Sequence, residues 1–261
     1  MTTPKRVLVT NDDGIKSPGL HALAAELAAN GHEVTIAAPA AEYSGSSASI
    51  LAVEEEGRIR VEERTIEGLE SVPAFAVSGA PGFISMIAAN GAFGDPPDVV
   101  FSGVNRGANV GRAILHSGTV GAALTAGING GRGMAVSLDT GLSPTNFYWK
   151  RAARMAVDLL PALLKHEPGT VLNLNVPNRN GATPAEYRVA TLAEFGIVQA
   201  TLAERGKQYV RLSVEDTIGE ADEQSDFKLL VAGYAPVTAI TAVTEAVIPS
   251  LQESLPKSSA W

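Results

Sequence analysis

The chain has 261 residues, of which 45% are hydrophobic and 18% are charged, and it carries a formal net charge of −8. This composition fits one large globular domain, and the acidic balance argues against a nucleic-acid polymer as partner, because such binders present basic patches. The absence of cysteine excludes disulfides, thiolate catalysis and cysteine zinc sites. With only four histidines, a metal site would consist mostly of oxygen ligands, which favours Mg²⁺, Mn²⁺ or Ca²⁺.

The N-terminal segment bears on the location of the protein. It reads MTTPKRVLVTNDDG, a short apolar run that turns acidic at Asp12. This pattern is typical of neither a signal peptide nor a transmembrane span. We therefore expect a cytoplasmic protein that is not attached to a membrane.

The first half of the chain alternates strand-like and helix-like segments. The apolar, β-branched run at residues 6–10 predicts a buried strand, residues 17–31 a helix, and residues 34–38 a second strand. Such a β-α-β unit implies a parallel sheet with a right-handed crossover. The pattern continues with an inserted hairpin at about residues 50–65 that contains an acidic turn, strands at 75–77 and 98–101, and a helix at 81–89.

The pattern changes after residue 178. Up to that point we expect one α/β core, residues 1–178, with a mostly parallel sheet flanked by helices. Residues 179–261 are rich in strand-like segments without clear βα units, which predicts a C-terminal appendage of the same domain that is buried against another subunit. The last predicted elements of the core are a helix at 120–126, a strand at 134–138, an amphipathic helix at 146–165 and a strand at 171–176.

Three polar clusters follow predicted strands. In a parallel α/β sheet, ligands bind beyond the carboxyl ends of the strands, near the point where the strand order reverses. We therefore expect the clusters to meet at that edge. They are residues 11–14 (Asn-Asp-Asp-Gly), 44–49 (Ser-Gly-Ser-Ser-Ala-Ser) and 102–109 (Ser-Gly-Val-Asn-Arg-Gly-Ala-Asn).

Asp12 and Asp13 indicate a cation site. Adjacent carboxylates repel each other, and burying either one unpaired is costly, so the pair calls for a compensating cation. Because the chain leaves the sheet at Gly14, both carboxylates could face one ion, with a hydroxyl such as Ser44 and an amide oxygen such as Asn105 as further ligands. The alternative is an ordinary turn or helix entry. The aspartates also argue against a dinucleotide site, which needs glycine backbone at this first turn.

Residues 116–121 (His-Ser-Gly-Thr-Val-Gly) open a helix and indicate a phosphate site. A helix N-terminus offers unpaired backbone N–H groups and the positive end of the helix dipole. An ordinary Ser/Thr helix cap is the alternative. His116 beside this loop is a candidate general acid, although a lone histidine is more often structural. The candidate phosphate contacts are Asn109, Ser117, Gly118 and Thr119.

Six motifs occur in order between about residues 5 and 240: VLVTNDDGIKSPGL, AEYSGSSAS, VSGAPG, DVVFSGVNRGANVG, HSGTVGAALTA and LNLNVPN. Together they resemble the survival protein E family of 5′/3′-nucleotidases, and their combination is far more specific than a lone glycine motif. The resemblance implies a Rossmann-like sheet, divalent-metal-dependent phosphomonoesterase activity on nucleotides, and dimers or tetramers built with exchanged C-terminal segments.

The resemblance also assigns roles to residues. It implies that the phosphate-side loop falls on Asn109 and on residues 117–119. Each position that matches a family metal ligand has the family's residue type, so the implied metal site is complete. The implied metal ligands are Asp12, Asp13, Ser44 and Asn105.

The chain departs from the family pattern at several positions. Ala48 stands where many members have histidine, and Ser225 replaces the common threonine before Asp226. Arg112 and Ala113 replace an acidic pair, and His116 replaces a tyrosine. These changes leave the implied metal ligands unchanged, but they bear on pocket shape and substrate preference.

We therefore expect a phosphomonoesterase that hydrolyses nucleoside 5′- and 3′-monophosphates with one Mg²⁺ or Mn²⁺ per subunit, as a homodimer or homotetramer. Without a cysteine or a serine-histidine-acid arrangement, attack by water is favoured over a covalent intermediate. Asp13 is the candidate base, although a carboxylate committed to a metal is a poor base. Two alternatives stay open: a phosphatase for sugar phosphates or short polyphosphate, and a nucleotide-binding family member that has lost catalysis.

Overall fold

A computed structural model of the chain describes residues 3–141, 144–180, 185–194, 198–205, 210–216 and 222–245. The strands of its central sheet are β1 (Arg6–Thr10), β2 (Glu33–Pro39), β5 (Val61–Glu63), β6 (Ala74–Val77), β7 (Val99–Arg106), β8 (Arg132–Asp139), β9 (Val171–Pro177), β10 (Tyr187–Val189) and β13 (Ala235–Ile240). They lie in the order β10-β13-β9-β8-β7-β1-β2-β6-β5. The six strands from β9 to β6 are parallel, which confirms the predicted α/β fold.

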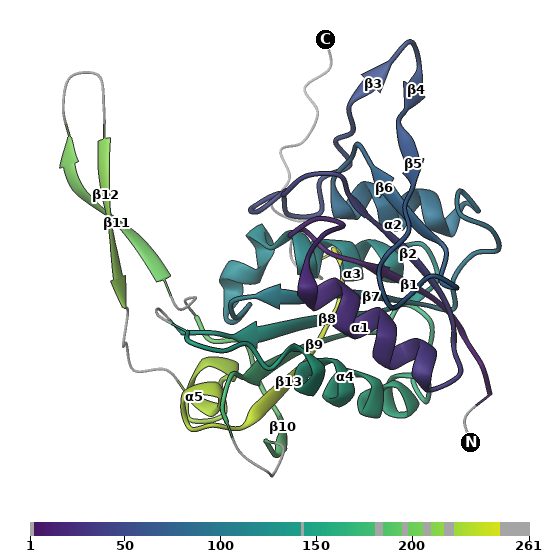
Figure 1. Cartoon of the computed structure of the whole chain (residues 1–261). Helices are drawn as coiled ribbons and strands as arrows, with labels where there is room; N and C mark the ends of the chain where they lie inside the picture. Colours follow the sequence, from purple (N-terminus) through teal and green to yellow (C-terminus); the bar gives the residue numbers. More distant parts are fainter. Residues whose placement is uncertain are drawn as a thin grey trace, which may run out of the picture.

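Helices cover both faces of the sheet (Figure 1). On one face α1 (Pro18–Ala29) packs beside α4 (Trp149–Leu163), and on the other α2 (Pro81–Ala89) packs beside α3 (Gly118–Ile128). Two short helices, η1 (Arg112–His116) and α5 (Asp226–Val231), precede α3 and β13. Within the described residues, no helix combines the length and the hydrophobicity that crossing a bilayer requires.

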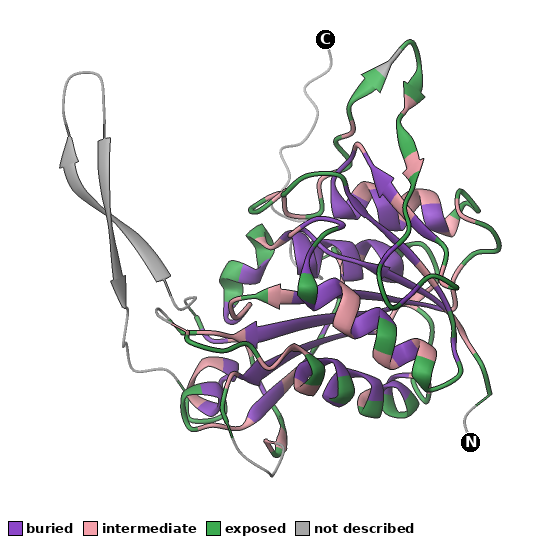
Figure 2. Cartoon of the chain, in the orientation of Figure 1, coloured by how far each residue is buried: buried purple, intermediate pink, exposed green. Residues whose placement is uncertain are grey.

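The core lies where the helices meet the sheet (Figure 2). Leu20, Leu23 and Leu27, which the spacing in the sequence places on one face of a helix, are fully buried in α1. They belong to the same cluster as Phe101 of β7 and Leu160 of α4. This packing fixes α1 against the sheet, and with it the loop that connects β1 to α1.

The strand order reverses between β1 and β7. From β1 the chain moves outward to β2 and β6, and then returns to place β7 on the other side of β1, before continuing to β8 and β9. The connections that follow β1 and β7 therefore diverge at the carboxyl edge of the sheet, where parallel sheets bind their ligands. Residues 11–14 and the end of the 102–109 cluster lie at this edge, as the sequence predicts.

Strand β7 is longer than the predicted strand and ends at Arg106. Its register with β8 shifts between Ser102 and Asn105, and Gly103 lies within this irregularity with φ 138°. A Cβ atom on Gly103 would be 2.2 Å from the carbonyl oxygen of Val136, so only glycine fits. Asn105 consequently lies on the end of a strand instead of in a loop.

Two other regions differ from expectation. The inserted hairpin pairs β3 (Glu54–Glu55) with β4 (Arg58–Ile59), so part of the predicted acidic turn is strand. In the C-terminal part, β11 (Val198–Arg205) and β12 (Val210–Asp216) form a separate antiparallel sheet, whereas β13 joins the central sheet antiparallel to β9. Residues beyond 178 therefore contribute to the central sheet as well as to the strand-rich segment.

Candidate active site

Asp12 is a buried acidic residue directly after β1, with only 6% of its surface exposed. The Thr119 hydroxyl donates a hydrogen bond to Asp12 Oδ1 at 2.5 Å, and the Tyr43 N–H donates to the Asp12 carbonyl at 2.8 Å. Burial raises the pKa of Asp12, and the hydrogen bond from Thr119 opposes this shift. The backbone of Asp12 is thus held by the loop after β2, and its carboxylate is held by the start of α3.

Asp13 lies beside Asp12 and is partly exposed. The backbone N–H of Arg106, at the end of β7, donates to Asp13 Oδ2 at 3.3 Å. Burial and the neighbouring charge of Asp12 raise the pKa of Asp13 to about 6. In the part of the chain that the structure describes, neither aspartate forms a salt bridge, so the pair lacks a compensating cation from the protein.

A tight turn holds the two aspartates at the strand end. The Asn11 side chain donates to the Gly14 carbonyl and accepts from the Gly14 N–H, both at 3.1 Å. Gly14 has φ 93°, a conformation that glycine adopts without strain. Asn11 is fully buried, and the sequence analysis assigned it no role. Its signal in the sequence is an asparagine three residues before a glycine, which is typical of side-chain-stabilised turns.

The N-terminus of α3 approaches Asp12 closely because residue 118 is glycine. A Cβ atom on Gly118 would be 2.8 Å from Asp12 Oδ2 and 2.6 Å from Ser46 Oγ, closer than real Cβ contacts. Gly121 has the same role one turn later, where a Cβ atom would be 2.3 Å from the Ser47 carbonyl oxygen. Two glycines of the helix therefore allow contact with both the first and the second polar cluster.

Ser117 and Thr119 both use their hydroxyl groups within the protein. Ser117 is the N-cap of α3 and its side chain accepts a hydrogen bond from the Val120 N–H at 3.1 Å, as the alternative interpretation of this motif expects. Thr119 is fully buried and donates to Asp12. The Ser117 N–H donates to the Ile114 carbonyl at 3.0 Å, so the backbone N–H groups of α3 that suit a phosphate are those of Gly118 and Thr119. His116 is exposed at the end of η1.

The serine-rich loop after β2 docks against the segment before α3. Ser47 Oγ donates to the Leu115 carbonyl at 2.6 Å, and Ser44 Oγ donates to Glu42 Oε1 at 2.6 Å on the exposed side of the loop. Ser46 Oγ is buried and has no hydrogen-bond partner among the described residues. Because this atom lies beside Gly118, a polar ligand next to Asp12 would supply the missing partner.

The asparagines of the third cluster are oriented by hydrogen bonds. Asn105 Nδ2 donates to the Gly107 carbonyl at 2.8 Å, which leaves its amide oxygen as the atom suited to a cation. Asn109 Nδ2 donates to Ser137 Oγ at 2.9 Å. The Asn109 N–H donates to Asn175 Oδ1. The Asn109 carbonyl accepts from the side-chain amides of both Asn175 and Asn173. The buried asparagines of β9 thus hold the loop that follows β7.

Asp226 connects this loop to the C-terminal part of the chain. Its carboxylate is fully buried and accepts hydrogen bonds from the backbone N–H groups of Gly111 (2.8 Å), Ala193 (3.0 Å) and Phe227 (2.8 Å). Burial raises the pKa of Asp226, and these hydrogen bonds oppose the shift. The sequence gives no sign of this role, because Gly111 and Ala193 lie far from Asp226 along the chain.

The residues predicted to hold a metal fit a hard divalent cation. Two buried or half-buried carboxylates, a hydroxyl and an amide oxygen are the ligand types that Mg²⁺ and Mn²⁺ bind. Within the described residues, no group of three or more histidine or acidic side chains could hold a metal ion. The candidate site contains only two such side chains, Asp12 and Asp13, so ligands of other kinds would complete it.

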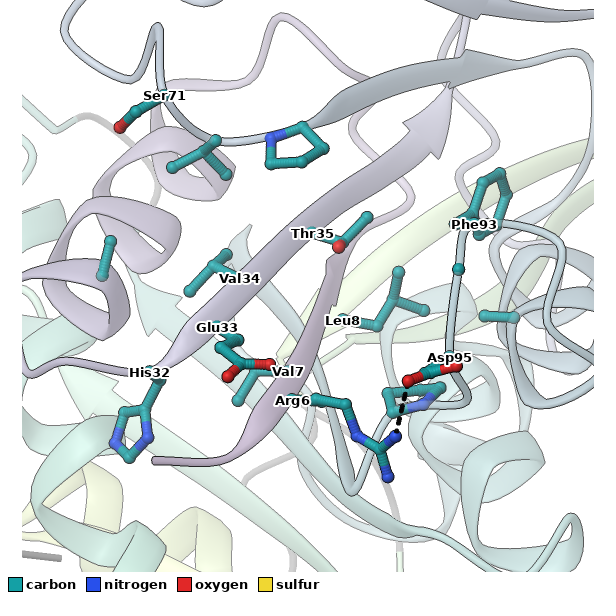
Figure 3. A pocket seen from close by; sticks show the side chains of 16 residues that line it. Arg6, Val7, Leu8, His32, Glu33, Val34, Thr35, Ser71, Phe93 and Asp95 are labelled. Carbon is teal, nitrogen blue, oxygen red and sulfur yellow. Dashed lines mark ion pairs between the residues drawn. The ribbon is translucent and has the colours of Figure 1, made fainter. Parts of the chain in front are cut away.

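A separate cavity of about 550 Å³ lies at the opposite end of the sheet (Figure 3). It is lined by residues at the start of β1 and β2, including His32 and Glu33, and by the segment before β7. Arg6 on its wall forms a salt bridge with Asp95 at 3.3 Å. Its position at the amino ends of the strands separates this cavity from the predicted site residues.

A parallel sheet with an acidic site at its switch point defines the chain as a Rossmann-like α/β protein with a polar ligand site. The family described as Survival protein SurE matches residues 7–197. The chain therefore belongs to the SurE family, which confirms the resemblance inferred from its motifs.

Similar proteins agree with this assignment. A protein of Clostridium beijerinckii named 5′-nucleotidase SurE is 35% identical over 241 residues, which are 89% of this chain and 91% of the relative. A protein of the same name from Methanopyrus kandleri is 35% identical over 274 residues, covering 96% of this chain and 99% of the relative. The crystal structure of the SurE protein from Aquifex aeolicus, 26% identical, covers 90% of this chain and 93% of that structure with a TM-score of 0.68.

Gly118→Ala should inactivate the site with limited loss of folding. The added Cβ atom would displace Asp12 or Ser46, and a displacement of about 1 Å can lower turnover about 100-fold. Phosphate release from a nucleoside monophosphate and the thermal unfolding temperature should be measured together. Wild-type turnover in this variant would show that the close approach of α3 to Asp12 is not needed.

Asp226→Ala should destabilise the protein strongly. The substitution leaves three N–H groups without their acceptor, and each buried unpaired donor costs about 1–3 kcal/mol. We expect the free energy of unfolding in urea to fall by about 3 kcal/mol or more. The matched control is Glu223→Ala on the exposed surface nearby, expected to change it by less than about 0.5 kcal/mol. Equal losses of unfolding free energy in the two variants would contradict the role of Asp226 as an anchor for the backbone around it.

Proposed function

We propose that the chain is a metal-dependent 5′-nucleotidase, a phosphomonoesterase that hydrolyses nucleoside 5′- and 3′-monophosphates to nucleoside and phosphate. The observation that carries the proposal is the pair Asp12 and Asp13, held at the switch point of the sheet without a salt-bridge partner among the described residues. Membership of the SurE family, whose curated relatives are named 5′-nucleotidase, supports it.

The metal would be one Mg²⁺ or Mn²⁺ per subunit. Asp12 and Asp13 would hold it, together with the hydroxyl of Ser44 and the amide oxygen of Asn105. When bound, a divalent cation offsets the charge of phosphoryl oxygens and lowers the pKa of a coordinated water. The raised pKa values of both aspartates support this assignment, because a cation relieves the repulsion that raises the pKa of Asp13.

The protein groups around the aspartates divide the remaining tasks. The backbone N–H groups of Gly118 and Thr119 would bind phosphate oxygens at the positive end of the α3 dipole, while the Ser117 N–H donates to the Ile114 carbonyl. Asn109, anchored by Asn175 and Ser137, would orient the same group. Asp13 is the candidate base for the attacking water, a role that competes with holding the metal.

We also propose the quaternary arrangement and the location expected from the sequence. The chain would act in the cytoplasm as a homodimer or homotetramer whose intersubunit contacts come from residues 179–261. Exposed apolar side chains of the described residues, among them Val189 at 86% and Val231 at 62% exposure, support contacts of this part with another subunit.

Asp12→Asn should abolish phosphate release while the fold is retained. The asparagine keeps an oxygen that accepts from Thr119 but loses the charge that binds a cation. Turnover of adenosine 5′-monophosphate should be measured with Mg²⁺, Mn²⁺ and EDTA, and EDTA should inactivate the wild type. Asp158→Asn on the exposed surface of α4 is the matched control and should remain active. Wild-type activity in Asp12→Asn would refute the metal assignment.

Metal binding should weaken in acid. A cation must displace the proton from Asp13, whose pKa of about 6 means that this carboxyl is mostly protonated at pH 5 and mostly ionised at pH 7. We expect Mn²⁺ affinity, measured by calorimetric titration, to be about tenfold lower at pH 5 than at pH 7. A constant affinity across this range would show that Asp13 is not a ligand.

A further inference from the structure

An aromatic surface lies next to the candidate active site. The rings of Phe147 and Trp149 are stacked, with centroids 5.2 Å apart and an interplanar angle of 4°. The guanidinium carbon of Arg106 lies 5.1 Å from the centroid of the Phe147 ring. We propose that this surface, Arg106-Phe147-Trp149, binds the nucleobase of the substrate by stacking. The inference rests on the proposed function and specifies which part of the nucleotide the chain recognises.

Arg106 connects the aromatic surface to the aspartates. Its backbone N–H donates to Asp13 Oδ2, while its side chain extends to Phe147. Asp13, where the phosphate group is proposed to bind, and the aromatic surface are therefore separated by one arginine side chain. In a nucleoside monophosphate the ribose similarly separates the phosphate from the base, so one substrate molecule could contact both.

The surface borders an open cavity of about 710 Å³ between the start of α1 and the start of α4. Phe147 is 36% exposed, with the Trp149 ring and the Arg106 guanidinium lying against its ring. Ligand pockets are typically concave and lined by aromatic side chains. The lining of the cavity includes Pro18, His21, Leu69, Phe147, Tyr148 and Trp149.

The position of Trp149 is fixed by backbone packing. Gly19 of α1 faces Val104 of β7 so closely that a Cβ atom there would be 2.1 Å from the Val104 carbonyl oxygen and 3.3 Å from Trp149 Cε3. Trp149 thus lies against Gly19 of α1, at the point where α1 packs closely on β7, the strand that ends beside Asp13. A rigid surface binds a planar ligand with little loss of conformational entropy.

The chemistry of the surface favours a nucleobase over a sugar. Planar bases stack on aromatic rings and on arginine, whereas a ribose or hexose has no π-face. Arg106 lies over the Phe147 ring and Arg151 lies over the Tyr148 ring. The neighbouring cavity is lined by both Lys150 and Glu67, so the positive charge that faces the Phe147 ring comes from Arg106.

The test compares a substrate that has a base with one that lacks it. Adenosine 5′-monophosphate is used as substrate, and ribose 5-phosphate as substrate or as competitive inhibitor. Phe147→Leu keeps an apolar side chain but removes the ring. We expect it to lower kcat/KM for the nucleotide about tenfold, mainly through KM, and to change the ribose 5-phosphate constant by less than about twofold. Phe147→Trp should restore nucleotide affinity because it restores a stacking face.

Two further variants make the outcome decisive. Ile128→Ala removes an exposed apolar side chain at the far end of α3 and should change neither constant. Leu115→Ala removes an exposed side chain on another rim, beside Ser47, and tests a competing location for the base. Selective loss of nucleotide affinity in Leu115→Ala but not in Phe147→Leu would overturn the proposal, as would equal losses for both ligands in Phe147→Leu.

A binding measurement without turnover separates this inference from the proposed function. The chain has two tryptophans, so Trp261→Phe leaves Trp149 as the only fluorophore of this type. Adenosine 5′-monophosphate should quench its emission in this background, and the quenching should be lost when Phe147→Leu is added. Quenching without phosphate release in the presence of Mg²⁺ or Mn²⁺ would leave base binding intact and refute the nucleotidase, whereas phosphate release without quenching would refute only the base site.

Discussion

Two neighbouring carboxylates are held at one edge of a parallel sheet, and the described part of the chain provides no salt bridge to either. Burial disfavours the ionised form of both aspartates, and the charge of Asp12 adds to this effect at Asp13, so hydrogen bonds and any bound cation stabilise the ionised pair. Thr119 and the Arg106 backbone supply the hydrogen bonds. The remaining charge is what makes this edge suited to a divalent metal and, through it, to a phosphate ester.

The rest of the site is built so that neutral hydrogen-bond donors lie close to the two carboxylates. Gly118 and Gly121 let α3 approach Asp12 and the serine-rich loop, and Gly103 lets β7 pass close to β8 before it ends at Asn105. A side chain at any of these positions would push apart elements that must converge. The motif glycines are therefore explained by close backbone approach, and the helix dipole adds to the site only because this approach is possible.

The site is supported both from β9 of the α/β core and from the C-terminal part of the chain. Asn173 and Asn175 of β9 hold Asn109, and Asp226 holds Gly111 together with a segment near residue 193. The Asp226 contacts link the loop after β7 to the C-terminal part of the chain. Changes in that part can therefore reach this loop, which carries Asn109.

Local patterns in the sequence determined the alternating strands and helices, the parallel sheet, and the three polar clusters at its carboxyl edge. Periodicity and strand-end position suffice for this, because apolar spacing is set by the geometry of each element alone. The pair Asp12 and Asp13 could be recognised in the same way, since adjacent charges are visible in the chain itself.

Only the tertiary structure decided which partners these residues have. That Thr119 bonds to Asp12, that Asp226 anchors Gly111, and that Arg106 lies over Phe147 are contacts between residues far apart in the sequence. The register shift at Gly103 and the return of β13 to the sheet likewise depend on packing between distant segments. The spacing of residues along the chain does not show which distant segments will pack together, so these contacts could not be predicted from it.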